Sequence, residues 1–227
     1  MHRSRRKQKH FNQIRDPSEK TNERKTLIRA DLHIHTTISD DSTVTPKVFV
    51  EQLAAHPFIK VAALTDHNTV QGCKLTLQLA SAYPDILIIP GVEISTAEGD
   101  IVILGTQELP PEPWTVGSVV DFARETGSVS VVAHPYREYG MGDIARKYKF
   151  DAVEILNGAS SASANRSAQE LARIMDVPGV AGTDAHKPED LFTVYTEIQA
   201  ELDVEEILKA VKKGLVKVST ATGSIHF

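Results

Sequence analysis

The sequence predicts an α/β protein in which parallel strands close into a barrel. From residue 28 onward, short apolar runs rich in Val, Ile and Leu alternate with longer segments of helical period. This alternation is typical of parallel strands joined by crossover helices. Side chains that can bind metals follow strand after strand, at the C-terminal end of each run. Those ends share one face in a barrel but spread along an edge in a doubly wound sheet, so the barrel is favoured.

Eight strands and five helices are expected from periodicity and from signals at the ends of elements. Pro46 stands where a first helical turn accepts proline, directly after Thr45 as the cap, and Asp203 is the expected cap of the last helix. The strands are expected at residues 27–35, 61–65, 86–94, 101–105, 129–133, 152–156, 180–183 and 194–199. The helices are expected from residue 46 and over residues 69–82, 116–125, 163–175 and 204–213.

The composition is that of a soluble globular protein. Of 227 residues, 41% are hydrophobic and 24% charged, which allows a substantial core. No apolar stretch approaches the ~20 residues of a membrane helix, and residues 1–25 contain no apolar segment of the kind that a secretory signal requires. Cys73 is the only cysteine, which excludes an internal disulfide and a thiolate cluster. A cytoplasmic location is expected, with any metal held by nitrogen and oxygen.

The charge divides the chain into a basic start and an acidic body. The first 30 residues carry ten Lys and Arg against three acidic residues, so they contribute +7 and the rest −12 to the total of −5. A basic segment poor in apolar residues cannot offset its folding entropy. We therefore expect residues 1–27 to form a disordered tail and residues 28–227 to form one domain. The tail is expected to be a solvated extension, with nonspecific nucleic-acid contact as the alternative.

Histidine and carboxylate side chains gather at the predicted strand ends. Residues two apart in a strand project to one face, so His33 with His35, and Asp184 with His186, can each grip one ion. Either pair alone is a weak signal, but their joint occurrence is a strong one, because the alternative is a set of buried polar groups without compensation. The residues at these ends are His33, His35, Asp66, His67, Glu93, His134, Asn157, Asp184 and His186.

This number of donors predicts a metal-dependent hydrolase. About nine nitrogen and oxygen donors exceed the four that a tetrahedral zinc site takes, so two or three divalent ions are expected, with Glu93 bridging two of them. Imidazole and carboxylate without sulfur suit manganese, zinc or iron. Clustered cations acidify a shared water and neutralise the charge that builds on phosphoryl oxygens. Hydrolysis of a phosphoester by a metal-activated hydroxide is therefore the leading reaction class.

Six motifs in fixed order resemble those of the PHP (polymerase and histidinol phosphatase) domain family. They are DLHIHTTISDD at 31–41, LTDHNT at 64–69, GVEIS at 91–95, AHPYR at 133–137, VEILNG at 153–158 and GTDAH at 182–186. The resemblance implies a distorted, TIM-like (β/α)7 barrel with a two- or three-metal phosphoesterase centre. It also implies three ligand sets: His33, His35, Glu93 and Asp184; Glu93, His134 and Asn157; and Asp40, His67 and His186.

Two ligands of these sets stay open. The family commonly has Ser-Asp-Gly where this chain has Ser39, Asp40 and Asp41, so either aspartate could be the ligand. Asn157 is a weaker ligand than the histidine of some relatives, and the centre is therefore either dinuclear or trinuclear.

Two carboxylates are expected to serve catalysis. Asp184 is expected to act as a metal ligand. Asp66 either binds a metal or orients a group that does, a role that metal-bound histidines usually require. Asp31, on the same strand face as His33, is another candidate for such orientation.

Two cations are candidates for binding the substrate phosphate. Arg137 follows His134 closely and could clamp a phosphate with its guanidinium, and Lys187 directly follows His186. No Walker loop or dinucleotide fingerprint indicates a nucleotide cofactor. The short segment between His134 and Asn157 leaves little room for an inserted substrate domain. We therefore expect an open site for a small phosphomonoester, or for the terminal phosphate of a nucleotide or short oligonucleotide.

Three other functions are kept as alternatives. A metal-dependent amide or ester hydrolase on a related barrel also uses His-x-His, but typically with a bridging lysine, and no strand-end lysine is placed for that role. A non-catalytic metal-binding regulatory module is disfavoured by the full set of ligands. A nucleic-acid-processing enzyme would use the basic tail to hold its substrate.

Overall fold

The computed structural model describes residues 26–221, so residues 1–25 of the tail expected over residues 1–27 lie outside the described residues. Thr26 and Leu27 already belong to the first strand, two residues before the boundary expected from the charge pattern. The described strands are β1 (Thr26–Asp31), β2 (Val61–Leu64), β3 (Leu87–Thr96), β4 (Gly99–Leu104), β5 (Val129–Val132), β6 (Ala152–Asn157), β7 (Gly179–Gly182), β8 (Val194–Ala200) and β9 (Val216–Thr220). The helices are α1 (Pro46–Ala55), α2 (Gln71–Ala80), α3 (Val116–Thr126), α4 (Ala162–Met175) and α5 (Val204–Lys212), with 3-10 turns η1 (Gly142–Lys147) and η2 (Pro188–Asp190).

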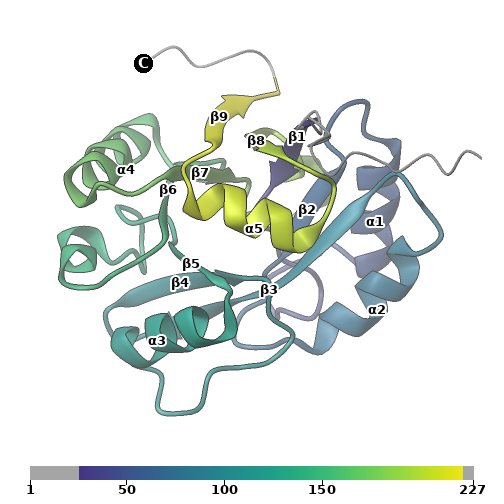
Figure 1. Ribbon diagram of the computed structural model, residues 1–227. Helices are drawn as coiled ribbons and strands as arrows, with labels where there is room; N and C mark the ends of the chain where they lie inside the picture. The colour runs from purple at the N-terminus through teal and green to yellow at the C-terminus, as the bar shows by residue number, and fades with distance from the viewer. Residues whose placement is uncertain (1–25, 222–227) are drawn as a thin grey trace, which may run out of the picture.

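The strands form one mixed sheet in the order β7-β6-β5-β4-β3-β2-β1-β8-β9 (Figure 1). Strands β1 to β3 are parallel to one another, as are β5 to β7. Past the end of β1, the chain turns to the far edge of the sheet, where Ile34 pairs with Ala185 in parallel and Asp184 N donates to His33 O at 2.8 Å. This contact nearly closes the sheet, and it confirms the predicted distorted α/β barrel.

Three strands depart from the expected parallel pattern. Strand β4 is antiparallel to both β3 and β5, β8 is antiparallel to β1, and β9, which was not expected, is antiparallel to β8. Parallel neighbours need a crossover of a dozen or more residues, whereas antiparallel neighbours can be joined by a tight turn. Residues 97–98 between β3 and β4 leave room only for such a turn. The expectation of parallel strands was therefore wrong for β4 and β8, and β9 was missed.

The helix starts follow the capping signals of the sequence. Thr45 Oγ1 accepts from Val48 N at 3.2 Å with Pro46 in the first turn, and Asp203 accepts from Glu206 N at 3.1 Å. Each cap satisfies a backbone donor that the helix itself cannot. None of the helices in the described part is long and apolar enough to span a membrane.

The apolar residues form one core inside the barrel and others under the outer helices. The inner core holds residues such as Val61, Ile89 and Val131 together with Ile207 and Val211 of α5. Helix α5 thus plugs one end of the barrel, and it lies across the strands in Figure 1. Outside, α1 and α2 pack against β2, β3 and Tyr195 of β8, while α3 and α4 cover β3 to β6. Because α5 fills one end of the barrel, the other end is the one available to polar side chains.

Gly182 marks the closest approach between β7 and the segment that carries His33. A Cβ at this position would lie 2.3 Å from His33 Cβ and 2.7 Å from His33 N. We expect Gly182→Ala to lower the free energy of unfolding by about 1–3 kcal/mol, because the backbone must move to admit the methyl group. Denaturant titration measures this change. Gly117→Ala is the control: its Cβ would meet only Thr115 Oγ1 at 4.0 Å, and stability should not fall. Equal stability of both variants would contradict the expectation.

Candidate metal centre

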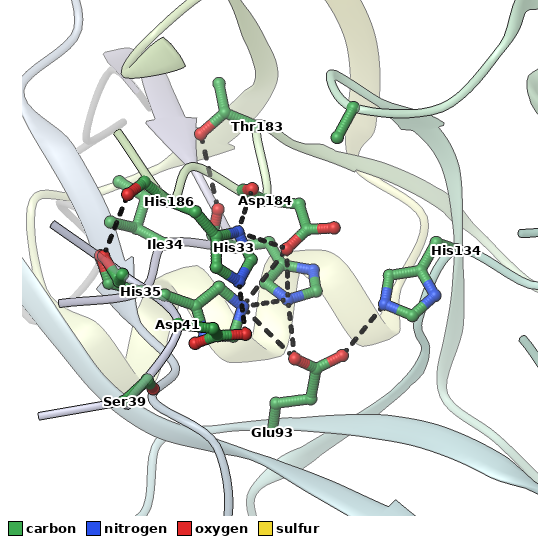
Figure 2. A network of polar contacts seen from close by, with 12 residues as sticks. His33, Ile34, His35, Ser39, Asp41, Glu93, His134, Thr183, Asp184 and His186 are labelled. Atoms are coloured by element: carbon green, nitrogen blue, oxygen red, sulfur yellow. Dashed lines mark hydrogen bonds and ion pairs between the residues drawn. The ribbon is translucent and has the colours of Figure 1, made fainter. Parts of the chain in front are cut away.

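The polar residues predicted at the strand ends meet at the barrel end opposite α5. Figure 2 shows their side chains pointing toward one another from different strands and loops. The metal-capable groups that come together are His33 with His35 and Asp184, His33 with Glu93 and His134, and His35 with His67 and His186. The structure thus brings together most of the ligands that were predicted from their spacing in the sequence.

The centre of the cluster is formed by His33 and His35. Their Nε2 atoms lie 3.0 Å apart, and Glu93 Oε2 lies 3.2 Å from each. Asp184 Oδ1 is 3.6 Å from His33 Nε2 and 3.2 Å from His35 Nε2. Two ligands of one ion with bonds of about 2.1 Å can be at most about 4.2 Å apart, so these donors are spaced to share an ion.

Glu93 contacts four histidines of the cluster. Its Oε1 lies 3.1 Å from His134 Nε2, while its Oε2 lies 3.2 Å from His67 Nδ1 as well as near His33 and His35. Glu93 Oε2 is nevertheless a buried oxygen without a hydrogen bond of acceptable geometry, and His35 Nδ1 and His134 Nδ1 share that condition. A buried carboxylate oxygen surrounded by imidazole nitrogens fits a cation between them. The donor set therefore fits divalent metal ions, and Glu93 is placed to bridge them.

The electrostatics of the cluster call for positive charge. Burial would lower the pKa of His33, but Glu93, Glu154 and Asp184 raise it well above its usual range. Burial likewise opposes the charged form of His35, yet the adjacent carboxylates of Asp184 and Glu93 raise its pKa to about 9. Burial would raise the pKa of Glu93, and His33 and His134 instead hold it well below its usual range. Metal ions and protons therefore compete for the same nitrogens, and metal binding should release protons.

Of the two aspartates left open by the sequence, Asp41 reaches the cluster. Its Oδ2 lies 3.1 Å from His186 Nε2 and 3.4 Å from His67 Nε2. Asp40 is exposed, and no hydrogen bond or ion pair within the described residues joins it to either histidine. The geometry therefore favours Asp41 over Asp40 as the carboxylate of this group.

Asp66 and Asp31 accept hydrogen bonds from the loops that carry candidate ligands, and not from the imidazole nitrogens at the centre of the cluster. Asp66 accepts from Thr36 N at 2.6 Å, from Thr36 Oγ1 and from Ser39 Oγ, and Ser39 Oγ in turn accepts from His67 N at 2.9 Å. Asp31 accepts from Thr183 N at 2.9 Å and Thr183 Oγ1 at 2.6 Å, which fixes the residue before Asp184. The structure thus gives each of them the geometry of an orienting carboxylate.

Two buried carboxylates at the site were not singled out in the sequence. Glu154 Oε1 lies 3.0 Å from His33 Nδ1, and Glu154 Oε2 accepts from His134 N at 2.8 Å. Asp100 lies 4.0 Å from His134 Nε2; burial, reinforced by Glu93, raises its pKa to about 6. The signal available in the sequence was a charge directly beside or within an apolar strand run, since such charges are rarely buried without a partner.

A cavity of about 560 Å³ opens over the cluster. His134, Asp184 and His186 form part of its wall together with Arg137 and Tyr139. The Arg137 guanidinium is one third exposed and is ion-paired with Asp184, and it also donates to Asn157 Oδ1 at 3.3 Å.

Lys187, the second predicted phosphate ligand, is placed differently. It is exposed, directly precedes η2 and does not line the cavity. Arg137 is therefore the cation that the structure brings to the cluster.

Backbone strain coincides with the site. His134 has φ +24° and Asp184 has φ +54°, in the left-handed region that side chains other than glycine rarely adopt. Such conformations cost about 1–3 kcal/mol each and persist where function fixes them. Their occurrence at two candidate ligands agrees with a functional centre.

Comparison of sequences gives relatives along much of the chain. A family model described as PHP-associated matches residues 162–216. The uncharacterized protein MJ1587 of Methanocaldococcus jannaschii is 31% identical over 142 residues, which cover 57% of this chain and 82% of that protein. The uncharacterized protein MJ0417 of the same organism is 29% identical over 190 residues, which cover 79% of this chain and 73% of that protein.

Solved structures show the same fold at low identity. A two-domain protein of Bacteroides vulgatus that contains a predicted PHP-like metal-dependent phosphoesterase matches with a TM-score of 0.72 and 18% identity, over 85% of this chain and 64% of that chain. The chain thus spans less than two thirds of that protein. An amidohydrolase of Chromobacterium violaceum, with sulfate and no metal bound, matches with a TM-score of 0.59 and 18% identity, over 71% of this chain and 89% of that chain. The chain thus carries a PHP-associated segment at residues 162–216 and has the fold of a PHP-like protein.

Proposed function

We propose that this protein is a metal-dependent phosphoesterase that hydrolyses a small phosphomonoester or the terminal phosphate of a nucleotide or short oligonucleotide. The observation that carries the proposal is the arrangement around Glu93, whose two oxygens face four imidazole nitrogens at 3.1–3.2 Å. Such a donor set is typical of clustered divalent cations. The PHP-like phosphoesterase of similar fold supports the same reaction class.

The residues divide into holding and positioning roles. His33, His35, Glu93 and Asp184 would hold one ion, and the other groups of the cluster one or two more, of manganese, zinc or iron. When bound, these ions acidify a water and neutralise charge on phosphoryl oxygens. Asp66 and Asp31 keep the ligand-bearing loops in place through their hydrogen bonds.

Arg137 is the proposed anchor for the substrate phosphate. Its guanidinium lies in the cavity wall against Asp184, so a phosphate held by it would lie beside the cluster. Guanidinium and phosphate match as bidentate partners. The cavity of about 560 Å³ is within the size range of sites for small molecules, which supports a phosphorylated substrate of modest size.

Phosphate release from a panel of phosphomonoesters tests the proposal. We expect turnover with added Mn²⁺, loss of turnover after chelation and recovery when Mn²⁺ is returned, because the proposed reaction needs divalent cations to acidify the attacking water and to neutralise charge on the phosphoryl oxygens. The panel contains histidinol phosphate, mononucleotides, nucleoside 3′,5′-bisphosphates and short 5′-phosphorylated oligonucleotides. If metal-loaded protein releases no phosphate from any compound of the panel, the proposal is contradicted.

An amide or ester hydrolase is the second candidate. The similar fold of the Chromobacterium violaceum amidohydrolase favours it. In this chain a glutamate, Glu93, occupies the bridging place, and no lysine lines the cavity among the described residues. Turnover of amides or esters by the same metal-loaded protein, without phosphate release, would establish this alternative.

A further inference from the structure

Asn157 stands where the family resemblance places a ligand of the second metal, but its amide is already fully engaged. Its Oδ1 accepts from Ala159 N at 3.0 Å, Ser160 Oγ at 2.9 Å and Arg137 Nη1 at 3.3 Å. Its Nδ2 donates to Glu154 Oε2 at 3.0 Å and Asp184 Oδ2 at 3.3 Å. An amide offers two donors and two acceptor lone pairs, so no capacity remains for a metal ion. Coordination through Oδ1 would require these contacts to break.

Asp100 offers a carboxylate close to Glu93 and His134. In the register of β3 and β4, Glu93 pairs with Val102 and Ser95 with Asp100. Opposed residues and residues two apart share a sheet face, so Asp100 and Glu93 project to the same side. Asp100 is 5% exposed and lines the cavity, with its Oδ2 4.0 Å from His134 Nε2. That separation is within the limit of about 4.2 Å for two ligands of one ion.

The backbone fixes Asp100 in this place. Its N donates to Tyr139 O at 3.0 Å, and its O accepts from Ala133 N at 3.4 Å. Ala133 directly precedes His134 in the chain, and Tyr139 lies on the loop that follows it. Asp100 and His134 are therefore held together by the same pieces of backbone, as pre-organised ligands are.

A carboxylate at this place is costly without a cation. Asp100 and Glu93 are both buried, and like charges on one sheet face repel each other. A divalent ion between Glu93, His134 and Asp100 would turn this repulsion into attraction for both carboxylates.

We propose that Asp100, and not Asn157, completes the metal position formed by Glu93 and His134. The inference rests on the metal centre proposed above, but it does not depend on the reaction. In this chain Asn157 then serves to tie Glu154, Asp184 and Arg137 together beside the ions.

Metal counting in the purified full-length protein tests the assignment. Metal-free protein is loaded with Mn²⁺ or Zn²⁺, bound metal is counted by mass spectrometry after gel filtration, and the affinity of the weakest ion is measured by calorimetry. We expect Asp100→Asn to bind one ion fewer, or to bind its weakest ion at least about tenfold less tightly. Asp121→Asn, an exposed carboxylate on α3, is the matched control and should bind as the wild type does.

Asp100→His separates ligation from a simple effect of charge. Imidazole is neutral but binds these metals, so this variant should restore the metal count that Asp100→Asn loses. Wild-type count and affinity in Asp100→Asn would overturn the proposal, as would a loss that Asp100→His does not restore. A wild-type protein that binds no metal would instead refute the metal centre itself, so the two failures can be told apart.

Discussion

An Asp184→Asn variant should lose most of the proposed phosphoesterase activity while it keeps its fold. Asp184 Oδ1 lies within 3.2–3.6 Å of nitrogens of His33, His35 and His186, and its other oxygen meets Arg137. Although burial opposes its charge, His33 and His35 hold the pKa of Asp184 well below its usual range. The carboxylate is therefore charged at neutral pH, and the amide removes that charge from the centre. A metal position contributes several kcal/mol to transition-state stabilisation, so kcat should fall by about 10²–10³-fold.

Phosphate release and bound metal are measured on the same preparation, with circular dichroism as the check of folding. Asp190→Asn is the matched control, because Asp190 is exposed in η2 of the same loop region. It should retain wild-type activity and metal content. Activity of Asp184→Asn within tenfold of the wild type, with a full complement of metal, would remove Asp184 from the centre.

Local signals in the sequence predicted the elements, whereas the directions of the strands depend on pairing that the sequence pattern does not contain. The Thr45–Pro46 cap and the Asp203 cap each lie within one turn of the helix that they begin, so they are readable from neighbouring residues. Whether β8 runs along or against β1 depends on contacts between residues far apart in the chain, such as Leu27 with Gln199. Strand β9 has only five residues and alternates apolar and polar residues over the first four, which is too short to stand out before its partner β8 is known.

The same division holds at the candidate site. His33, His35 and His186 could be predicted because their spacing and their place after a strand are properties of the sequence. The choice between Asp40 and Asp41 could not, since it depends on how the turn after His35 is closed, with Thr37 N donating to Val44 O and Ser39 N to Thr36 O. Glu154 and Asp100 were missed because each looks like an isolated charge in the sequence until the fold brings a histidine from another segment to it.

Glu154→Ala should weaken both the fold and the metal centre. The carboxylate meets three groups at once: His33 Nδ1 at 3.0 Å, His134 N at 2.8 Å and Asn157 Nδ2 at 3.0 Å. It is 2% exposed, so its removal leaves buried donors without partners and His33 without a counter-charge. Loss of one partner of a buried charged pair costs about 3–5 kcal/mol of stability. Groups that orient a metal-bound histidine contribute about 10–100-fold in metal affinity, and we expect that loss as well.

Glu154→Gln separates these two effects through the protonation of His33. The glutamine oxygen can still accept from His134 N and Asn157 Nδ2, so most of the stability should remain. Its amide group then faces His33 Nδ1, which must accept a hydrogen bond and so moves the ring proton to Nε2. Nε2 is the atom of His33 that faces His35 and Glu93. A proton on Nε2 competes with a metal ion for this atom. Metal affinity should therefore fall by about 10–100-fold although the fold is kept. Denaturant titration and metal titration measure the two quantities, and Glu170→Gln, on the exposed face of α4, should change neither. Wild-type metal affinity in Glu154→Gln would show that His33 does not bind metal through Nε2.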